Sequence, residues 1–226
     1  METNIVTVNK VILQDELKYD DKILLSYRIE YPEFRASRYQ MCLTVVNKFY
    51  RNKALEYKKR AEEELFSLAV EQYKEAVEHG YPVRVFEVIQ EFEVTYSQSC
   101  IISLYMDQYE YTGGAHGATV RQSQTWNLQK CGLVKLCRLV QCPPGCREYI
   151  FKKVEAQIAK NPEIYFENYH ELIRETFNEN SFYCTPQGIV VYYQQYDIAP
   201  YASGIREFKI PYSDCVINPA SQCFAV

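Results

Sequence analysis

The spacing of apolar and polar residues divides the first third of the chain into strand-like and helix-like stretches. Residues 4–13 and 22–31 are rich in Val, Ile, Leu and Tyr and predict a pair of β-strands. Residues 37–78 instead repeat apolar side chains at every third or fourth position, which is the period of an α-helix. Gly80 and Pro82 follow this stretch, so we expect one long helix that ends there.

The rest of the chain alternates between strand-like and helical patterns. Three stretches predict antiparallel strands, at 83–96, 100–111 and 119–128. Two helical stretches follow, at 146–160 and 167–177. Three strand-like stretches come last, at 181–185, 189–194 and 206–210. Because the helices are segregated from the hairpins, we expect an α+β fold. It would have mainly antiparallel sheets, one long N-terminal helix and two shorter helices in the C-terminal half.

The length of the chain favours two subdomains. A chain of 226 residues and 26.6 kDa is at the upper end of what one hydrophobic core usually serves. We expect residues 1–100 to form a β-β-long helix-β subdomain, and residues 101–226 to form a C-terminal α+β domain.

Charge and hydropathy argue against two classes of partner. Lys and Arg number 25 against 29 Asp and Glu, so the net charge is −4 and the isoelectric point is about 5.6. No basic groove is visible in the sequence, and we therefore expect no nucleic-acid binding. No window approaches the roughly 18 apolar residues that a membrane-spanning helix needs, so we expect no membrane insertion. The oligomeric state stays open.

The nine cysteines are many for a chain of this length, and their number is odd. A secreted protein with this count would carry a disulfide framework and one remaining thiol. The N-terminal residues show neither the basic segment nor the apolar stretch of a secretory signal. We therefore expect a cytoplasmic protein with reduced thiols, and a disulfide-bonded protein is the alternative.

One cluster of cysteines could in principle hold zinc: Cys131, Cys137, Cys142 and Cys146. Its spacing differs from the C-x₂₋₄-C pairs of structural zinc sites, so we expect buried or unused thiols instead. His170 begins a sequence like the zinc-protease motif H-E-x-x-H, but Arg174 stands where the second histidine is needed. We expect no metal and no cofactor.

The common motifs for nucleophiles and phosphate binding are missing from the sequence. It contains no G-x-S-x-G elbow, no C-x-x-C pair and no G-x-x-x-x-G-K-[ST] loop. Carboxylates are plentiful, but the sequence does not place two of them at the separation that glycoside hydrolysis needs. We therefore assign no catalytic residue.

A glycine-rich stretch at 111–117 is the first candidate binding site. Its glycines allow a positive φ and a close approach of the backbone to a partner. The candidate contacts are Gly113, Gly114, His116 and Gly117. His116 would be a ligand contact or a general base, and the alternative is a hydrogen-bonding residue inside a tight strand connection.

The second candidate site is a tyrosine-rich stretch at 192–204, in a chain with 21 tyrosines. Tyrosines around a proline make a rigid and amphipathic loop, which is the composition that protein-recognition surfaces favour. The candidate contacts are Tyr196, Asp197, Pro200 and Tyr201. The alternative is a loop that covers the core.

These two stretches also carry a family resemblance. Tyr-Thr-Gly-Gly-Ala-His-Gly at 111–117, Asp-Ile-Ala-Pro-Tyr-Ala-Ser-Gly at 197–204 and Ile-Pro-Tyr-Ser-Asp at 210–214 resemble a bacterial domain family of unknown function. That family includes the extracellular domain of the lysozyme-sensing anti-sigma factor RsiV and an accessory domain of a peptidoglycan deacetylase. The resemblance covers roughly 105–215. Tyr-Pro-Glu-Phe at 31–34, followed by the long helix, resembles the smaller companion domain that often precedes it.

The resemblance implies an α+β fold, and in RsiV the domain binds lysozyme directly. Gly113, Gly114, His116 and Gly117 match one family motif, and Tyr196 to Tyr201 with Gly204 match the other. No catalytic residues come with these motifs. No transmembrane helix, sigma-binding segment, signal peptide or deacetylase domain is visible in the sequence, so we expect neither the signalling role nor the enzyme activity to transfer.

Together these observations predict a non-enzymatic binding module for a protein or a cell-wall-related ligand, with lysozyme-like binding implied only by the resemblance. The alternative is a small hydrolase that acts on cell-wall or sugar substrates through His116 and a carboxylate such as Asp197.

Overall fold

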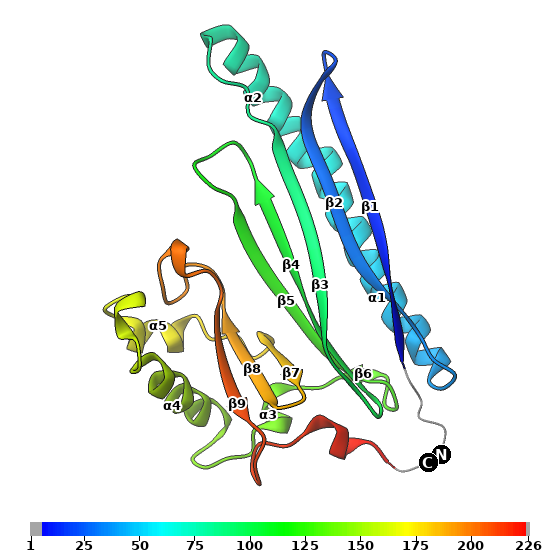
Figure 1. Cartoon of the computed structure of the whole chain (residues 1–226), viewed down its shortest axis with the longest axis vertical. Helices are drawn as coiled ribbons and strands as arrows, with labels where there is room; N and C mark the ends of the chain where they lie inside the picture. Colours follow the sequence, from blue (N-terminus) through cyan, green and yellow to red (C-terminus); the bar gives the residue numbers. More distant parts are fainter. Residues whose placement is uncertain (1–5, 225–226) are drawn as a thin grey trace. The chain divides into compact units, whose positions relative to one another are not determined.

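The computed structural model describes residues 6–224 and divides into two compact units (Figure 1). Unit 1 comprises the chain up to Phe92 together with Asp107–Val120, and unit 2 comprises Glu93–Met106 together with the chain from Arg121 onwards. The division crosses three strands, which contribute residues to both units: β3 (Phe86–Gln98), β4 (Ile101–Tyr111) and β5 (Ala118–Asn127). The prediction of a boundary at residue 100 stays a prediction.

Unit 1 begins with a long β-hairpin. Strands β1 (Thr7–Tyr19) and β2 (Lys22–Arg35) pair antiparallel, and Asp20 and Asp21 form the turn with φ of 48° and 59°. A two-residue turn with positive φ at both positions matches the right-handed twist of the strands it joins. The six-stranded sheet then continues in the order β1-β2-β3-β4-β5-β6, where β6 is Gly132–Leu133.

A long helical segment connects β2 to β3. It consists of α1 (Gln40–Lys59), a π-helical turn η1 (Arg60–Leu65) and α2 (Phe66–His79), and it runs along the hairpin in Figure 1. Its buried face carries small residues that allow a close approach to the sheet, namely Ala54, Ala61 and Ala69. They pack with buried residues of β2 and β3, such as Leu25, Ile29, Phe86 and Val88.

The helix explains why β2 and β3 pair parallel, in a register that joins Leu25 to Phe86. Parallel neighbours need a crossover connection, and an α-helix is the usual one. The fold is therefore α+β, but the expected fold class was wrong in three respects. The larger sheet is mixed, and the longest helical segment is not N-terminal, because it follows two strands. The C-terminal half also contains a third helix, the single turn α3 (Leu136–Leu139).

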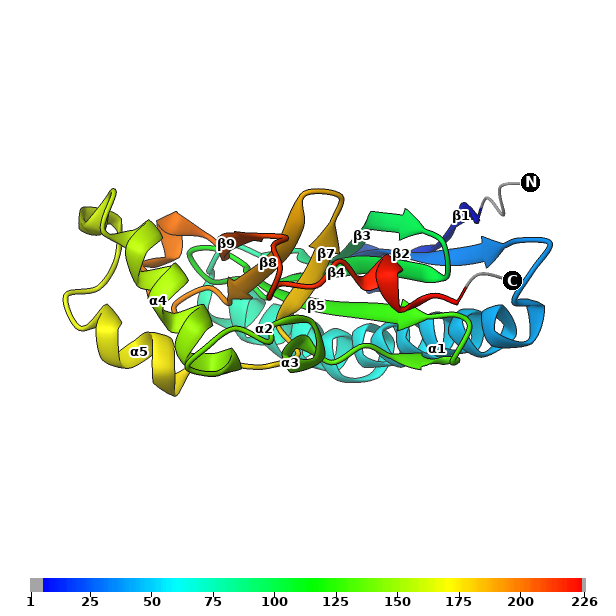
Figure 2. The same ribbon diagram turned by 90° about the horizontal axis from the view of Figure 1, so that it is seen from below.

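Unit 2 contains a three-stranded antiparallel sheet in the order β7-β8-β9. Its strands are β7 (Phe182–Thr185), β8 (Gly188–Tyr193) and β9 (Arg206–Pro211), and every residue of the central strand β8 is buried. Helix α4 (Cys146–Ile158) packs against β9 and against α5 (Tyr169–Glu175), as Figure 2 shows. A strand buried on both faces explains the uninterrupted apolar run Ile-Val-Val-Tyr-Tyr.

Disulfide bonds close several loops of unit 2. The bonds Cys100–Cys223, Cys137–Cys146 and Cys142–Cys215 have Cα separations of 5.8, 5.4 and 4.9 Å. Cys42 and Cys131 are also disulfide-bonded, whereas Cys184 is a buried free thiol. The expectation of reduced thiols was therefore wrong. All four cysteines of the suspected zinc cluster are bonded to sulfur, which leaves no thiolates for a metal.

Among residues 6–224, no helix combines the length and the apolar character that crossing a membrane requires.

Candidate functional site

The tyrosine-rich loop at 194–205 connects β8 to β9 in unit 2. Two residues in the left-handed region of backbone conformation shape it, Tyr196 with φ of 66° and Gly204 with φ of 64°. A non-glycine residue such as Tyr196 adopts this conformation only when its surroundings hold it there. A short 3₁₀ turn, Tyr201–Ser203, precedes Gly204 and leads into β9.

Side-chain hydrogen bonds anchor the start of this loop. The Gln194 amide binds the backbone of Arg121 in both directions: its Oε1 accepts from the Arg121 N–H at 2.9 Å, and its Nε2 donates to the Arg121 carbonyl at 2.7 Å. The carboxylate of Asp197 in turn accepts the backbone N–H of Gln194 at 2.7 Å. Burial raises the pKa of Asp197 above its usual range, although this hydrogen bond acts in the opposite direction.

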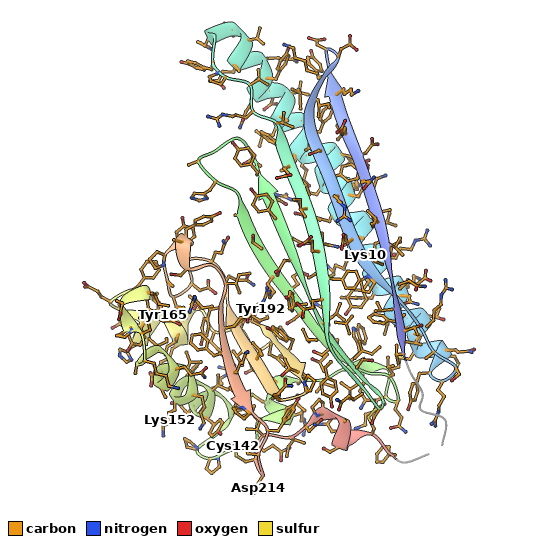
Figure 3. All side chains as sticks on the ribbon, in the orientation of Figure 1. Lys10, Cys142, Lys152, Tyr165, Tyr192 and Asp214 are labelled. Atoms are coloured by element: carbon orange, nitrogen blue, oxygen red, sulfur yellow. A yellow bond between two sulfur atoms is a disulfide. The ribbon has the colours of Figure 1, made fainter. Side chains whose placement is uncertain are left out.

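The second half of the loop binds to the segment 164–166. The Phe166 N–H donates to the Ile198 carbonyl at 3.1 Å, and the Ser203 hydroxyl donates to the Ile164 carbonyl at 3.1 Å. The Arg206 guanidinium donates to the Tyr165 hydroxyl at 3.1 Å and to the Ser203 carbonyl at 3.0 Å. Tyr165, in the segment 164–166, is labelled in Figure 3. Both ends of the loop are therefore held by named contacts.

The loop presents aromatic side chains to the surface. Tyr196 is 56% exposed, and its ring centroid lies 5.8 Å from that of Tyr201. Pro200 is exposed, whereas Ile198 and Ala199 are buried and hold the loop from within. Tyrosine rings combine apolar area with a hydroxyl that can hydrogen-bond, which is the arrangement that recognition surfaces use.

The glycine-rich turn lies in unit 1 and connects β4 to β5. Gly113 has φ of 87°, and a Cβ at this position would lie 2.8 Å from the Gln72 side-chain oxygen. Gly117 is buried, and its Cβ would lie 2.4 Å from the Tyr109 ring. Close packing therefore explains glycine at these two positions, because the turn lies against the side chains of Gln72 and Tyr109. Gly114 is exposed, and a Cβ there meets nothing closer than 3.8 Å.

His116 is exposed on this turn, and its Nδ1 lies 3.0 Å from the Gly117 carbonyl oxygen. A carbonyl only accepts hydrogen bonds, so Nδ1 carries the proton in this contact. The predicted contacts thus fall into two groups, Gly113 to Gly117 in unit 1 and Tyr196 to Tyr201 in unit 2. Their roles in binding stay predictions, as does the hydrolase alternative.

Two further observations concern chemistry at other positions. Burial raises the pKa of the Cys184 thiol to about 11, which makes this thiol a poor nucleophile. Within the described part of the chain, no group of three or more His, Cys, Asp or Glu side chains could hold a metal ion. The residues that the sequence did not reveal are the anchors Gln194, Tyr165 and Arg206, because they act through contacts between distant segments.

Comparisons with known proteins also place the two groups of predicted contacts in different segments of the chain. Residues 18–119 match the family model described as Deacetylase PdaC, and residues 143–213 match that of a protein family of unknown function, DUF3298. The glycine-rich turn lies in the first segment and the tyrosine loop in the second. No curated protein matches the chain.

Two crystal structures of DUF3298 family proteins have a similar fold. The protein from Bacteroides fragilis has a TM-score of 0.67 and 20% identity, over 93% of this chain and 92% of that chain. The protein from Pseudomonas aeruginosa PAO1 has a TM-score of 0.63 and 15% identity, over 96% and 97%. The resemblance inferred from the motifs is thereby confirmed: the chain carries a PdaC-like segment followed by a DUF3298 segment, in the fold of DUF3298 family proteins.

Proposed function

We propose that this protein is a non-enzymatic binding module that recognises a protein or a cell-wall-related ligand through the tyrosine-rich loop at 194–205. The observation that carries this proposal is the exposed ring of Tyr196, 5.8 Å from that of Tyr201, on a loop whose backbone is anchored at both ends.

The physical argument concerns the cost of ordering a binding surface. Association loses free energy for every side chain and loop that must become ordered, so a surface that is ordered beforehand binds more tightly. The hydrogen bonds of Gln194, Asp197 and Ser203 already hold this loop. Tyrosine adds large contact area with only two side-chain torsions, and it is enriched among the residues that dominate binding energies.

We also propose an oxidising compartment for this protein, in place of the cytoplasm that the sequence analysis expected. Disulfides persist in oxidising environments and are rare in a reducing cytoplasm. Eight of the nine cysteines are bonded, which supports this placement. An extracytoplasmic protein can meet both lysozyme and cell-wall polymers. The resemblance to the RsiV ectodomain, which binds lysozyme, favours lysozyme as one of these ligands.

The test combines a variant of the loop with a matched control. Wild-type protein, the double variant Tyr196→Ala with Tyr201→Ala, and the control Tyr81→Ala are each mixed with lysozyme on a sizing column and with purified peptidoglycan in a sedimentation assay. Tyr81 is a suitable control because it is a 60% exposed tyrosine outside the loop.

We expect the wild-type protein and Tyr81→Ala to bind one of these two probes. We expect the double variant to bind at least tenfold more weakly, which corresponds to a loss of about 1.4 kcal/mol or more. Equal binding by all three proteins would show that the loop is not the contact surface. Absence of binding to both probes would contradict the proposed ligand classes.

A further inference from the structure

A groove in unit 2 carries positive charge that the sequence analysis did not detect. It has a volume of about 470 Å³ and lies between the turn after β5 and helix α3. Among the described residues that line it are three bases and no acid: Lys130, Lys135 and Arg138. All three bases are exposed, in a chain whose net charge is −4. The groove is therefore a local exception to the acidic character of the protein.

One of the residues that line this groove, Asn127, carries an unsatisfied donor. Asn127 lines the groove and is only 3% exposed. Its Oδ1 accepts the backbone N–H groups of Gln129 and Lys130 at 3.0 and 2.9 Å, which stabilises the turn. The orientation of the amide is thereby determined, because the opposite orientation would place its NH₂ group against these two donors.

The Asn127 Nδ2 has no hydrogen-bond partner within the described residues, and less than 1 Å² of its surface is exposed. A buried donor without an acceptor costs about 1–3 kcal/mol, and such groups in folded proteins call for an explanation. An acceptor from outside the chain would remove this cost.

We propose that this groove binds an oxyanion, the phosphate or carboxylate group of a small anionic ligand, which accepts a hydrogen bond from Asn127 Nδ2 and pairs with Lys135 and Arg138. An arginine fork and a lysine ammonium are the side chains that recognise phosphate and carboxylate groups. The amide NH₂ supplies a neutral donor at a buried position, where a third charge would be costly to bury. This site is independent of the tyrosine loop, so the two proposals can fail separately.

Two variants remove different parts of the site while the turn is kept. Asn127→Asp retains the oxygen that accepts from Gln129 and Lys130, but it replaces the donor with a negative charge. Lys135→Gln with Arg138→Gln removes two exposed charges. The control is Lys152→Gln with Lys160→Gln, which removes two exposed charges elsewhere in unit 2; Lys152 is labelled on α4 in Figure 3.

The measurement is an NMR titration of ¹⁵N-labelled full-length protein with inorganic phosphate and, separately, with acetate, at constant ionic strength. We expect saturable shifts of amides in 127–138 for the wild-type protein and the control. We expect at least tenfold weaker binding for both site variants. Saturation by phosphate alone supports a phosphate ligand, and saturation by acetate alone supports a carboxylate ligand.

Two outcomes would overturn the proposal. The first is that neither anion gives saturable shifts in the wild-type protein, which would mean that an ordered water accepts the hydrogen bond of Asn127 Nδ2. The second is that the control variant binds as weakly as the site variants, which would mean that the amide shifts report only a general effect of charge.

Discussion

At the scale of single residues, Glu30 combines burial with a full negative charge. Its side chain is 2% exposed, and it forms ion pairs with Lys10, labelled in Figure 3, and with Arg28. Burial by itself would raise the pKa of Glu30, but hydrogen bonds and attraction from these two bases outweigh it and lower the pKa. A carboxylate with a lowered pKa stabilises the fold at neutral pH, and this contribution is lost as pH falls through its folded pKa.

We expect Glu30→Gln to reduce the free energy of unfolding at pH 7 by about 1–2 kcal/mol, because it weakens two charge-assisted hydrogen bonds. The loss should shrink as the pH falls below 4.5, the pKa of an unperturbed glutamate, because the unfolded chain then takes up a proton while the folded carboxylate stays ionised down to its own lower pKa. Urea unfolding across this pH range measures both effects. Glu33→Gln, which changes a 38% exposed side chain of the same strand, should cost less than about 0.5 kcal/mol. Identical pH profiles for Glu30→Gln and the wild-type protein would contradict the assigned role.

At the scale of elements, the local sequence pattern predicted helices and loops that are set by neighbouring residues. It missed the strand pairing and hydrogen bonds that join distant residues. The helix expected at 146–160 is α4 at Cys146–Ile158, since Pro162 ends the pattern nearby. The parallel pairing of β2 with β3 was not predicted, because it joins residues some 60 positions apart in the chain. The same holds at the candidate site. Local composition located the tyrosine loop, but the bond between Gln194 and Arg121 depends on the completed fold.

Gly188 shows why β8 and β9 can lie side by side at the end of their pairing. Gly188 pairs with Pro211, and a Cβ on Gly188 would lie 2.3 Å from the backbone oxygen of Ile210. A backbone atom cannot rotate away as a flexible side chain can, so the strands would have to separate. We expect Gly188→Ala to destabilise the protein by about 1–3 kcal/mol, as overpacking typically does.

Thermal unfolding of Gly188→Ala beside Gly132→Ala measures this effect. The Cβ of the control would meet nothing closer than 4.0 Å, so its midpoint should stay near that of the wild-type protein. A Gly188→Ala midpoint as high as that of the control would show that β9 does not constrain this position.

At the scale of the whole molecule, disulfides link segments that are far apart in the chain. Cys100–Cys223 spans 123 residues, and Cys142–Cys215 spans 73. In the chain-entropy model, each bond that closes a loop of this length stabilises the folded state by about 4–5 kcal/mol, because it restricts the unfolded chain. The sequence showed the number of cysteines but not their pairing, since pairing is set by which Cα atoms the fold brings within about 6 Å.

A thiol titration of protein purified without reductant distinguishes the bonded state from the reduced one. We expect no rapidly reacting thiol in the folded protein, because Cys184 is buried and its pKa is raised to about 11. We expect one thiol after unfolding in denaturant, and nine after unfolding with reductant, because eight cysteines are bonded. Cys184→Ser should abolish the single thiol of the unreduced protein. Nine thiols without reductant would contradict the bonded structure and would restore the cytoplasmic placement, because every loop closure would then be missing from the purified protein.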